Sequence, residues 1–257
     1  MTAADDWRAA LAAWAIPEGI LAQAPESPWI HPPALFGVPE RVADSPSHAR
    51  AREALGDEAS VLDVGCGGGV AAMALVPPAR RLTGVDHQAA MLEMFSENAR
   101  RRGVESSTLE GDWPDVADRA PVADVVTCHH VLYNVGDVAP FLAALDEHAR
   151  RRVVIEMPTR HPLTAMNDAW RHFWGLERPD GPTPADLVAV LAEMGLDAHL
   201  ETFASTSTRE VDPEQAVAFA RARLCLPASR DDEVRRFLDE HPVPATRTLA
   251  TVWWDRG

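Results

Sequence analysis

Three glycines follow a short apolar run at a spacing that suits the binding of a ligand by the backbone. Gly65, Gly67 and Gly69 each stand two residues from the next. Glycine lets a backbone approach a ligand closely, and the helix that follows such a turn directs its free N–H groups at that ligand. Val70 stands where a dinucleotide fingerprint has its third glycine, and Asp63 is also atypical of that fingerprint. The pattern indicates a ligand-binding turn, with a purely structural strand–helix turn as the alternative.

Two further acids stand where they could bind another part of the same ligand. Asp86 ends the next apolar run, where a carboxylate can accept hydrogen bonds from two neighbouring ribose hydroxyls. Asp112 and Trp113 follow the third run, directly after Gly111. The alternatives are an exposed loop acid for Asp86 and simple core burial for Trp113, because large aromatic residues are buried on average.

Proton-accepting side chains follow the fourth and fifth apolar runs. His129 and His130 end the fourth run, and Glu156 and His161 lie at the end of the fifth. A histidine can act as a general base near neutral pH, so these positions are candidates for proton transfer. For His161, the alternative is a loop histidine that caps a helix.

Aromatic and polar residues near these histidines are candidates for the wall of a substrate pocket. They are Tyr133, Asn134, Trp170, Phe173 and Trp174. Aromatic residues at positions i, i+3 and i+4 usually form the buried face of a helix. The same side chains can line a pocket for an apolar substrate, so the last three have two open interpretations.

The candidate residues lie between elements that alternate regularly along the chain. The apolar runs predict strands at 60–65, 81–86, 106–111, 123–130 and 152–158, with helices at 70–76, 88–103 and 138–151. This alternation implies a parallel sheet with helices on both faces. The carboxyl ends of its strands meet at one edge, where we expect the candidate residues to gather.

The remaining segments extend this sheet. After residue 158 the pattern predicts a helix at 183–196, a strand at 197–204, helices at 212–224 and 229–241, and a strand at 246–255. We therefore expect an α/β fold with a doubly wound, seven-stranded, mostly parallel sheet. Its parts are an N-terminal helical segment at 1–58 and a domain at 59–257, in which 205–245 is a helical insertion before the last strand.

Composition limits the classes of function. The net charge of −15 opposes the binding of nucleic acids, whose phosphates such a surface repels. No apolar run approaches the roughly 20 residues that span a bilayer, and the acidic N-terminus lacks the basic region of a signal peptide. We expect a cytoplasmic protein without a membrane partner. The three cysteines and ten histidines lack metal-ligand spacing, so we expect no metal.

Four segments together are similar to the motif series of class I S-adenosylmethionine-dependent methyltransferases. They are DVGCGGG, GVDHQAAML, LEGDW and ADVVTCHHVLYNV, and the resemblance covers about residues 58–160. They look most like the branch that methylates small molecules. The resemblance implies a Rossmann-like sheet of seven strands, S-adenosylmethionine as cofactor and S-adenosylhomocysteine as product.

The resemblance also implies a set of residues that contact the cofactor. They are Asp63, Gly65, Cys66, Gly67, Gly69, Asp86, His87, Met91, Gly111, Asp112, Trp113 and His129. The loop glycines would pack against the methionine part, and Asp63 would order the loop and reach the amino group directly or through water. Asp86 would bind the ribose, and Met91 or the nearby His87 and Gln88 would flank the adenine. Asp112 would accept from the adenine amine beside Trp113. For the histidines after the fourth strand, packing and cofactor contacts are the alternatives to catalysis.

The function expected from these residues is metal-independent methyl transfer to a small molecule. Oxygen is favoured over nitrogen or carbon as the methylated atom, because the segment after the fourth strand lacks the [DNS]-P-P-[YF] signature of nitrogen methylation. Residues 1–58 and 205–245 would form a lid over the acceptor.

Three alternatives remain open: an NAD(P)-dependent oxidoreductase, an S-adenosylmethionine-binding protein without catalysis, and an RNA or protein methyltransferase. The acceptor and the oligomeric state, monomer or homodimer, are open as well.

Overall fold

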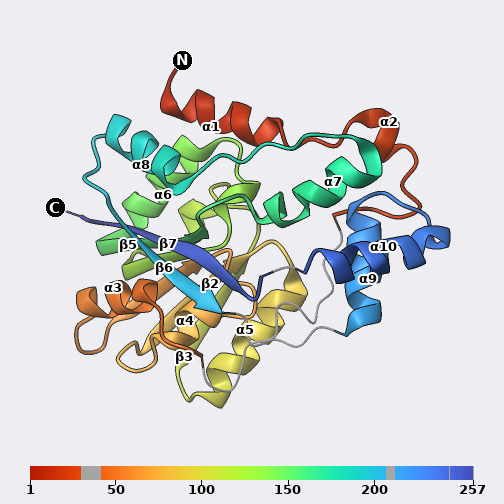
Figure 1. The fold of residues 1–257 in the computed structure, drawn as a ribbon. Helices are drawn as coiled ribbons and strands as arrows, with labels where there is room; N and C mark the ends of the chain where they lie inside the picture. The colour runs from red at the N-terminus through yellow and green to blue at the C-terminus, as the bar shows by residue number, and fades with distance from the viewer. Residues whose placement is uncertain (30–41, 207–211, 243, 257) are drawn as a thin grey trace.

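A single mixed sheet organises the fold, as the computed structural model in Figure 1 shows. The structure describes residues 1–29, 42–206, 212–242 and 244–256. Its strand order is β3-β2-β1-β4-β5-β7-β6, and only β7 runs antiparallel to its neighbours. The strands are β1 (Ser60–Val64), β2 (Arg81–Asp86), β3 (Glu105–Glu110), β4 (Ala123–His129), β5 (Ala149–Pro158), β6 (His199–Thr206) and β7 (Thr246–Asp255). The predicted doubly wound, seven-stranded, mostly parallel sheet is confirmed.

Helices cover both faces of this sheet. They are α1 (Ala3–Ala12), α2 (Glu18–Leu21), α3 (Pro46–Ala54), α4 (Val70–Ala74), α5 (Ala89–Arg101), α6 (Val138–His148), α7 (Asn167–Trp174), α8 (Pro184–Glu193), α9 (Pro213–Arg223) and α10 (Asp231–Glu240). Helices α1, α6 and α8 pack on one face. Helices α3, α4 and α5 contact the strands through a separate set of buried residues. Within the described ranges, no helix combines the length and apolar composition needed to cross a bilayer.

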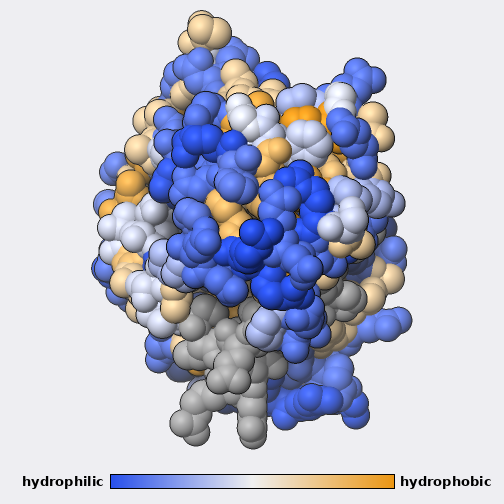
Figure 2. All heavy atoms as spheres, turned by 45° about the vertical axis from the view of Figure 1, so that its right-hand side comes forward, coloured by the Kyte–Doolittle hydropathy of each residue, from blue (hydrophilic) through white to orange (hydrophobic). Residues whose placement is uncertain are grey.

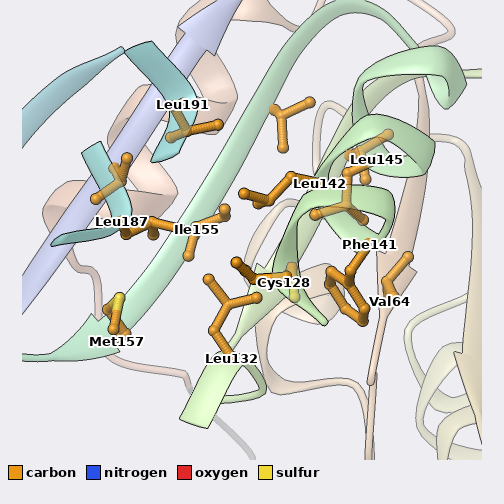
Figure 3. Close-up of a cluster of buried hydrophobic side chains, with 14 of the residues drawn as sticks. Val64, Cys128, Leu132, Phe141, Leu142, Leu145, Ile155, Met157, Leu187 and Leu191 are labelled. Atoms are coloured by element: carbon orange, nitrogen blue, oxygen red, sulfur yellow. The ribbon is translucent and has the colours of Figure 1, made fainter. Parts of the chain in front are cut away.

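The strand β5 shows how alternation builds the two main cores. Val153, Ile155 and Met157 join the core under α6 and α8, whereas Val154 joins the core on the opposite face. Successive side chains of a strand point to opposite faces, so a strand covered on both sides reads as a continuous apolar run. Figure 3 shows side chains of α6 and α8, among them Leu142 and Leu187, gathered around Ile155.

The boundary between α6 and β5 differs from the sequence prediction by three residues. The helix predicted over 138–151 ends at His148, and β5 begins at Ala149 instead of Arg152. Ala149 pairs with Ala123 of β4, and the carbonyl of Arg151 accepts a hydrogen bond from Arg256 N at 2.8 Å. Sheet hydrogen bonds therefore outweigh the helical propensity of alanine and arginine in this segment.

The N-terminal segment is distributed over several parts of the molecule. In α1, Trp7 is fully buried, and its Nε1 donates to Val135 O at 2.9 Å. Helix α3 packs instead against β5, β4 and β7. A lid role for residues 1–58 as a whole stays a prediction, because these two helices contribute to the packing of the sheet.

A third, smaller core lies beyond the edge of the sheet. It unites α7 with α9 and α10, the helical pair between β6 and β7, through Trp170, Phe173, Val217 and Phe237. Ile16, which follows α1, belongs to the same cluster. Figure 2 shows that the surface on this side is mostly hydrophilic, with apolar side chains in small patches. Residues far apart in the sequence thus form one cap with its own core.

Candidate active site

The glycine turn between β1 and α4 is held tightly by the protein itself. Gly65 has a φ of +69° and Gly69 a φ of +91°, a region that residues with a side chain rarely adopt. A Cβ on Gly65 would lie 2.3 Å from Val131 Cγ2, and one on Gly69 would lie 2.7 Å from the Phe95 ring. Both glycines are therefore required by the turn and its packing. The third, Gly67, also has a positive φ, of +50°.

Asp86 connects this turn to the start of α5. One carboxylate oxygen, Oδ2, accepts from Gly67 N at 2.9 Å, and the other, Oδ1, accepts from Gln88 N at 2.9 Å. Asp86 ends β2, which neighbours β1 in the sheet, so its side chain meets the glycine turn at the carboxyl edge. The structure thus brings together the first two sequence motifs, with a carboxylate at their junction.

Asp63 lies deeper, beneath the glycine turn. It is 1% exposed, and it accepts from Thr127 Oγ1 at 2.8 Å and from Ala72 N at 3.3 Å. Burial raises the pKa of Asp63 to about 7, against the opposing effect of these two hydrogen bonds. The side chain ties β1 to β4 and α4. Burial likewise raises the pKa of the neighbouring Cys66 thiol, so this cysteine stays protonated.

The residues expected around an adenine lie after β2 and β3. Gly111 N donates to Asp86 O at 3.1 Å, which joins the two strand ends. His87 and Asp112 are both exposed, with 3.9 Å between His87 Nδ1 and Asp112 Oδ1. Met91, on α5, is buried. These side chains therefore flank one open part of the edge.

Trp113 packs against α6. Its Nε1 donates to Phe141 O at 3.3 Å, and its ring meets the His148 ring edge-on at 5.0 Å between centroids. Both partners belong to α6, so the indole packs against that helix. A position of Trp113 beside an adenine stays a prediction.

His130 forms the most polar arrangement at the end of β4. Its Nε2 lies 3.0 Å from Glu156 Oε1, and its backbone N donates to Glu156 O at 2.7 Å. The other carboxylate oxygen of Glu156 accepts from Ser45 Oγ, the residue that caps α3, at 3.1 Å. His130 also has a φ of +62°, a strained backbone conformation for a residue with a side chain. The end of β4, the strand β5 and the cap of α3 thus meet at Glu156.

Glu156 is charged although it is 7% exposed. Burial raises the pKa of this carboxyl, but the hydrogen bond from His130, with smaller contributions from the nearby histidines and Ser47, outweighs burial and holds the pKa well below its ordinary value. A carboxylate at this position requires the proton of the neutral His130 ring to be on Nε2. Nδ1 is then the nitrogen that can accept a proton.

The other two candidate histidines lie in less polar surroundings. His129 is half-buried and packs against the His48 ring at 5.7 Å, and within the described ranges its buried Nε2 has no hydrogen-bond partner. Burial lowers the pKa of His129 to about 3. Burial and the charge of Arg178 lower the pKa of His161 to about 4. The His161 ring stacks on Trp14 at 3.9 Å.

His161 also has a structural role. Its Nδ1 accepts from Leu163 N at 3.2 Å, so it caps the short 3-10 turn Pro162–Met166. Of the three candidate histidines, His130 alone has a partly exposed ring next to a carboxylate.

The candidate pocket residues divide between two places. Tyr133 is buried and donates to Pro158 O at 2.8 Å, while Asn134 is exposed. Trp170 lines a hollow beside the third core. Phe173 and Trp174 pack in or against that core, where Trp174 Nε1 donates to Leu224 O at 2.7 Å.

Sequence reasoning did not single out two residues of this region, His48 and Arg178. Each meets its aromatic partners only through the tertiary fold. Among the residues that the structure describes, no group of three histidine, cysteine, aspartate or glutamate side chains is arranged to bind a metal.

Sequence comparison identifies the central segment. Residues 61–151 match the family model described as "Methyltransferase domain". The ubiquinone biosynthesis O-methyltransferase of Rickettsia akari is 32% identical over 90 residues, which is 35% of this chain and 36% of that protein. The enzyme of the same name from Aeromonas salmonicida is 32% identical over 105 residues, 40% of this chain and 44% of that one. The chain thus spans well under half the length of these relatives.

Solved structures extend the likeness to most of the chain. A structure described as precorrin 8W decarboxylase, from Methanobacterium thermoautotrophicum, has a TM-score of 0.52 at 16% identity and covers 88% of this chain and 96% of its own. A putative methyltransferase from Bacillus halodurans has a TM-score of 0.54 at 16% identity, with 81% and 96% covered. At these identities the likeness shows a common fold.

Proposed function

We propose that this protein transfers the methyl group of S-adenosylmethionine to an oxygen of a small molecule. The premise is that residues 61–151 form a class I S-adenosylmethionine-dependent methyltransferase domain. The observation that carries the proposal is the Asp86 carboxylate, which accepts hydrogen bonds from Gly67 N of the glycine turn and from Gln88 N. These two contacts support the proposal, because they bring one carboxylate to the junction of the glycine turn and the start of α5.

The residues at this edge fit the cofactor chemically. Each oxygen of Asp86 accepts one backbone hydrogen bond, and an ionised carboxylate has about four acceptor sites, so two remain for the ribose hydroxyls. The exposed Asp112 can accept from the adenine amine, with His87 beside it. His129 Nε2, a buried nitrogen without a partner in the described residues, provides a donor or acceptor at the end of β4. Gly65, Cys66, Gly67 and Gly69 would face the methionine part.

The proposed chemistry assigns the proton of the acceptor hydroxyl to His130. The bound cofactor supplies an electrophilic methyl group, and transfer is an in-line displacement that depends on positioning. His130 Nδ1 accepts the hydroxyl proton, because Glu156 fixes the other ring nitrogen as a donor. The negative charge of Glu156 then stabilises the imidazolium. His129 and His161 are weaker candidates for this role, because burial lowers the pKa of His129 to about 3 and that of His161 to about 4, which makes both rings poor proton acceptors.

Calorimetric titration of the full chain with S-adenosylhomocysteine tests the cofactor assignment. We expect micromolar binding by the wild type and binding weakened at least tenfold, about 1.4 kcal/mol, by Asp86→Ala and by Asp112→Ala. Asp118→Ala, an exposed acid in the turn Ala117–Arg119 after β3, is the matched control and should bind as the wild type does. A folded wild-type protein that does not bind S-adenosylhomocysteine would refute the proposal.

A further inference from the structure

Ser45 is bound at the same time to a helix and to the carboxylate beside His130. Its Oγ accepts from His48 N at 3.3 Å, which caps the first turn of α3, and donates to Glu156 Oε2 at 3.1 Å. A serine hydroxyl has one proton to donate and two lone pairs that accept, so both hydrogen bonds exist together. The side chain of Ser45 therefore joins the start of α3 to the carboxyl end of β5, across 111 residues of sequence.

The two carboxylate oxygens of Glu156 have different partners. Oε1 lies 3.0 Å from His130 Nε2, whereas Oε2 accepts from Ser45 Oγ. The last torsion of a glutamate side chain is broad and roughly two-fold, so a carboxylate held by one partner alone can turn. A second donor, fixed on Oε2, limits this rotation and keeps Oε1 directed at the imidazole.

The start of α3 is itself fixed to the sheet. Helix α3 packs against β5, β4 and β7. Ser47, two residues after Ser45, is fully buried, and its Oγ lies 2.6 Å from Thr251 Oγ1 on β7. Thr251 is the partner of Glu156 in the pairing of β5 with β7. The helix therefore holds the Ser45 hydroxyl at a constant place beside the carboxylate.

Capping alone does not account for the contact between Ser45 and Glu156. Thr2 and Thr183 cap α1 and α8, and in both cases an aspartate three residues further on completes a capping box. In α3 the corresponding residue is His48, and the hydroxyl proton of Ser45 is directed to Glu156 instead. Ser45 thus differs from these two caps, because its donor binds a carboxylate of a distant strand.

We propose that Ser45 is a positioning residue of the methyl-transfer site: its hydroxyl holds Glu156 in the orientation that keeps a proton on His130 Nε2 and leaves Nδ1 to accept the proton of the acceptor hydroxyl. This inference rests on the proposed role of His130. It extends that role, because it makes the start of α3, in the N-terminal segment, part of the structure that orients the base.

A set of substitutions separates this role from capping. Ser45→Ala removes both hydrogen bonds of the hydroxyl. Ser45→Asp caps a helix as well as serine does, but its carboxylate has no proton to donate and repels Glu156. Ser45→Thr keeps the hydroxyl and is the conservative rescue. Thr183→Ala, which removes the cap of α8, is the matched control.

The first readout is nitrogen-15 NMR of the full chain, labelled at histidine and without cofactor. The spectrum of His130→Asn assigns the His130 signals, since asparagine tolerates the positive φ of this position. We expect the Nε2 proton of His130 to exchange with water about tenfold faster in Ser45→Ala and in Ser45→Asp than in the wild type, because its acceptor is no longer held. Ser45→Thr and Thr183→Ala should stay within about threefold of the wild type.

A thermodynamic cycle is the second readout. Ser45→Ala is combined with His130→Asn, and urea unfolding of the wild type, both single variants and the double variant gives four unfolding constants. A residue that only caps α3 shares no partner with His130, so its effect is the same in both backgrounds. If Ser45 acts through Glu156, its effect on the unfolding constant should differ by about threefold or more between the backgrounds.

Three results would overturn the inference. They are wild-type exchange in Ser45→Asp, equal exchange in the wild type and Ser45→Ala, and additive effects in the cycle. Ser45→Asp keeps the cap, so the test does not depend on the folding of Ser45→Ala. Binding of S-adenosylhomocysteine by the wild type is measured separately, and its absence would refute the proposed methyl transfer without changing the histidine measurements.

Discussion

The lowered pKa of His129 makes the stability of the fold depend on pH in a way that one substitution isolates. Burial lowers the pKa of His129 to about 3, whereas an unfolded chain has a histidine pKa of about 6.5. Below pH 6.5 the unfolded state therefore binds a proton that the folded state does not bind. The unfolded state is favoured as the pH falls, and the contribution of His129 to stability decreases from pH 6.5 toward pH 3.

The size of the effect follows from the linkage relation. Each pH unit between the two pKa values changes the free energy of unfolding by about 1.36 kcal/mol. Between pH 7 and pH 5, about 1.5 pH units lie below the unfolded-state pKa of 6.5, so the free energy of unfolding falls by about 2 kcal/mol. This change is large enough to measure by urea unfolding, because single domains are stable by only about 5–15 kcal/mol.

The assay is urea unfolding of the wild type and of His129→Phe at pH 7, 6 and 5. Phenylalanine keeps an aromatic ring against His48 and does not titrate, so its packing cost is the same at every pH. Other titrating groups, such as His161, contribute alike to both proteins and cancel in the difference. We expect the wild type to lose about 2 kcal/mol relative to His129→Phe between pH 7 and pH 5.

A difference that stays constant across this range would refute the reasoning. It would mean that His129 keeps an ordinary pKa in the folded protein and that its ring has access to water or to a partner. A direct NMR titration of the ring distinguishes these outcomes, since a midpoint above pH 6 contradicts the burial effect.

Two more substitutions test the glycine turn and the acid beneath it. Gly65→Ala should lower the free energy of unfolding in urea by several kcal/mol, because a Cβ there would lie 2.3 Å from Val131 Cγ2. Gly103 is the control, since it has a similar φ of +65° and no atom within 4 Å of an added Cβ, so Gly103→Ala should cost only about 1–2 kcal/mol. Equal costs would contradict the packing explanation. For Asp63, burial raises the pKa to about 7 from 3.8, so wild-type stability is lost as the pH rises between these values. The advantage of Asp63→Asn over the wild type should grow by about 2 kcal/mol between pH 5 and pH 7, and a flat difference would show that Asp63 ionises normally.

Local signals predicted the framework of this protein well. The strand runs, the glycine turn and the position of Asp86 each depend on residues close in sequence, through side-chain alternation or backbone conformation. The strand order and the antiparallel direction of β7 were not part of the prediction, because they depend on which distant strands pair. The start of β5 was wrong because its partner, Ala123, lies in another strand and carries no signal in the local sequence.

The side-chain environments could not be predicted because they are made by distant parts of the chain. Glu156 meets His130 because β4 and β5 are neighbours in register, with His129 opposite Glu156. Trp113 packs on α6 through Phe141 O, a contact that no spacing in the sequence reveals. Arg178 donates to Trp14 O across 164 residues of sequence. Sequence therefore indicates which residue types are available, and the fold decides which of them become buried, paired or exposed.

The separate cores of the sheet and of the cap bear on how independently these two parts of the molecule can change. Ile16 and Trp170 belong to the cap core, whereas Asp63 and Asp86 depend on the sheet and its helices. Mutations in sites that share no partners usually add independently in free energy. A substitution in the cap core should therefore leave the stability of the glycine turn unchanged. The exception is Arg178, which lowers the pKa of His161 by its charge and binds the segment after α1. A substitution of this arginine would therefore also affect the residues that follow β5.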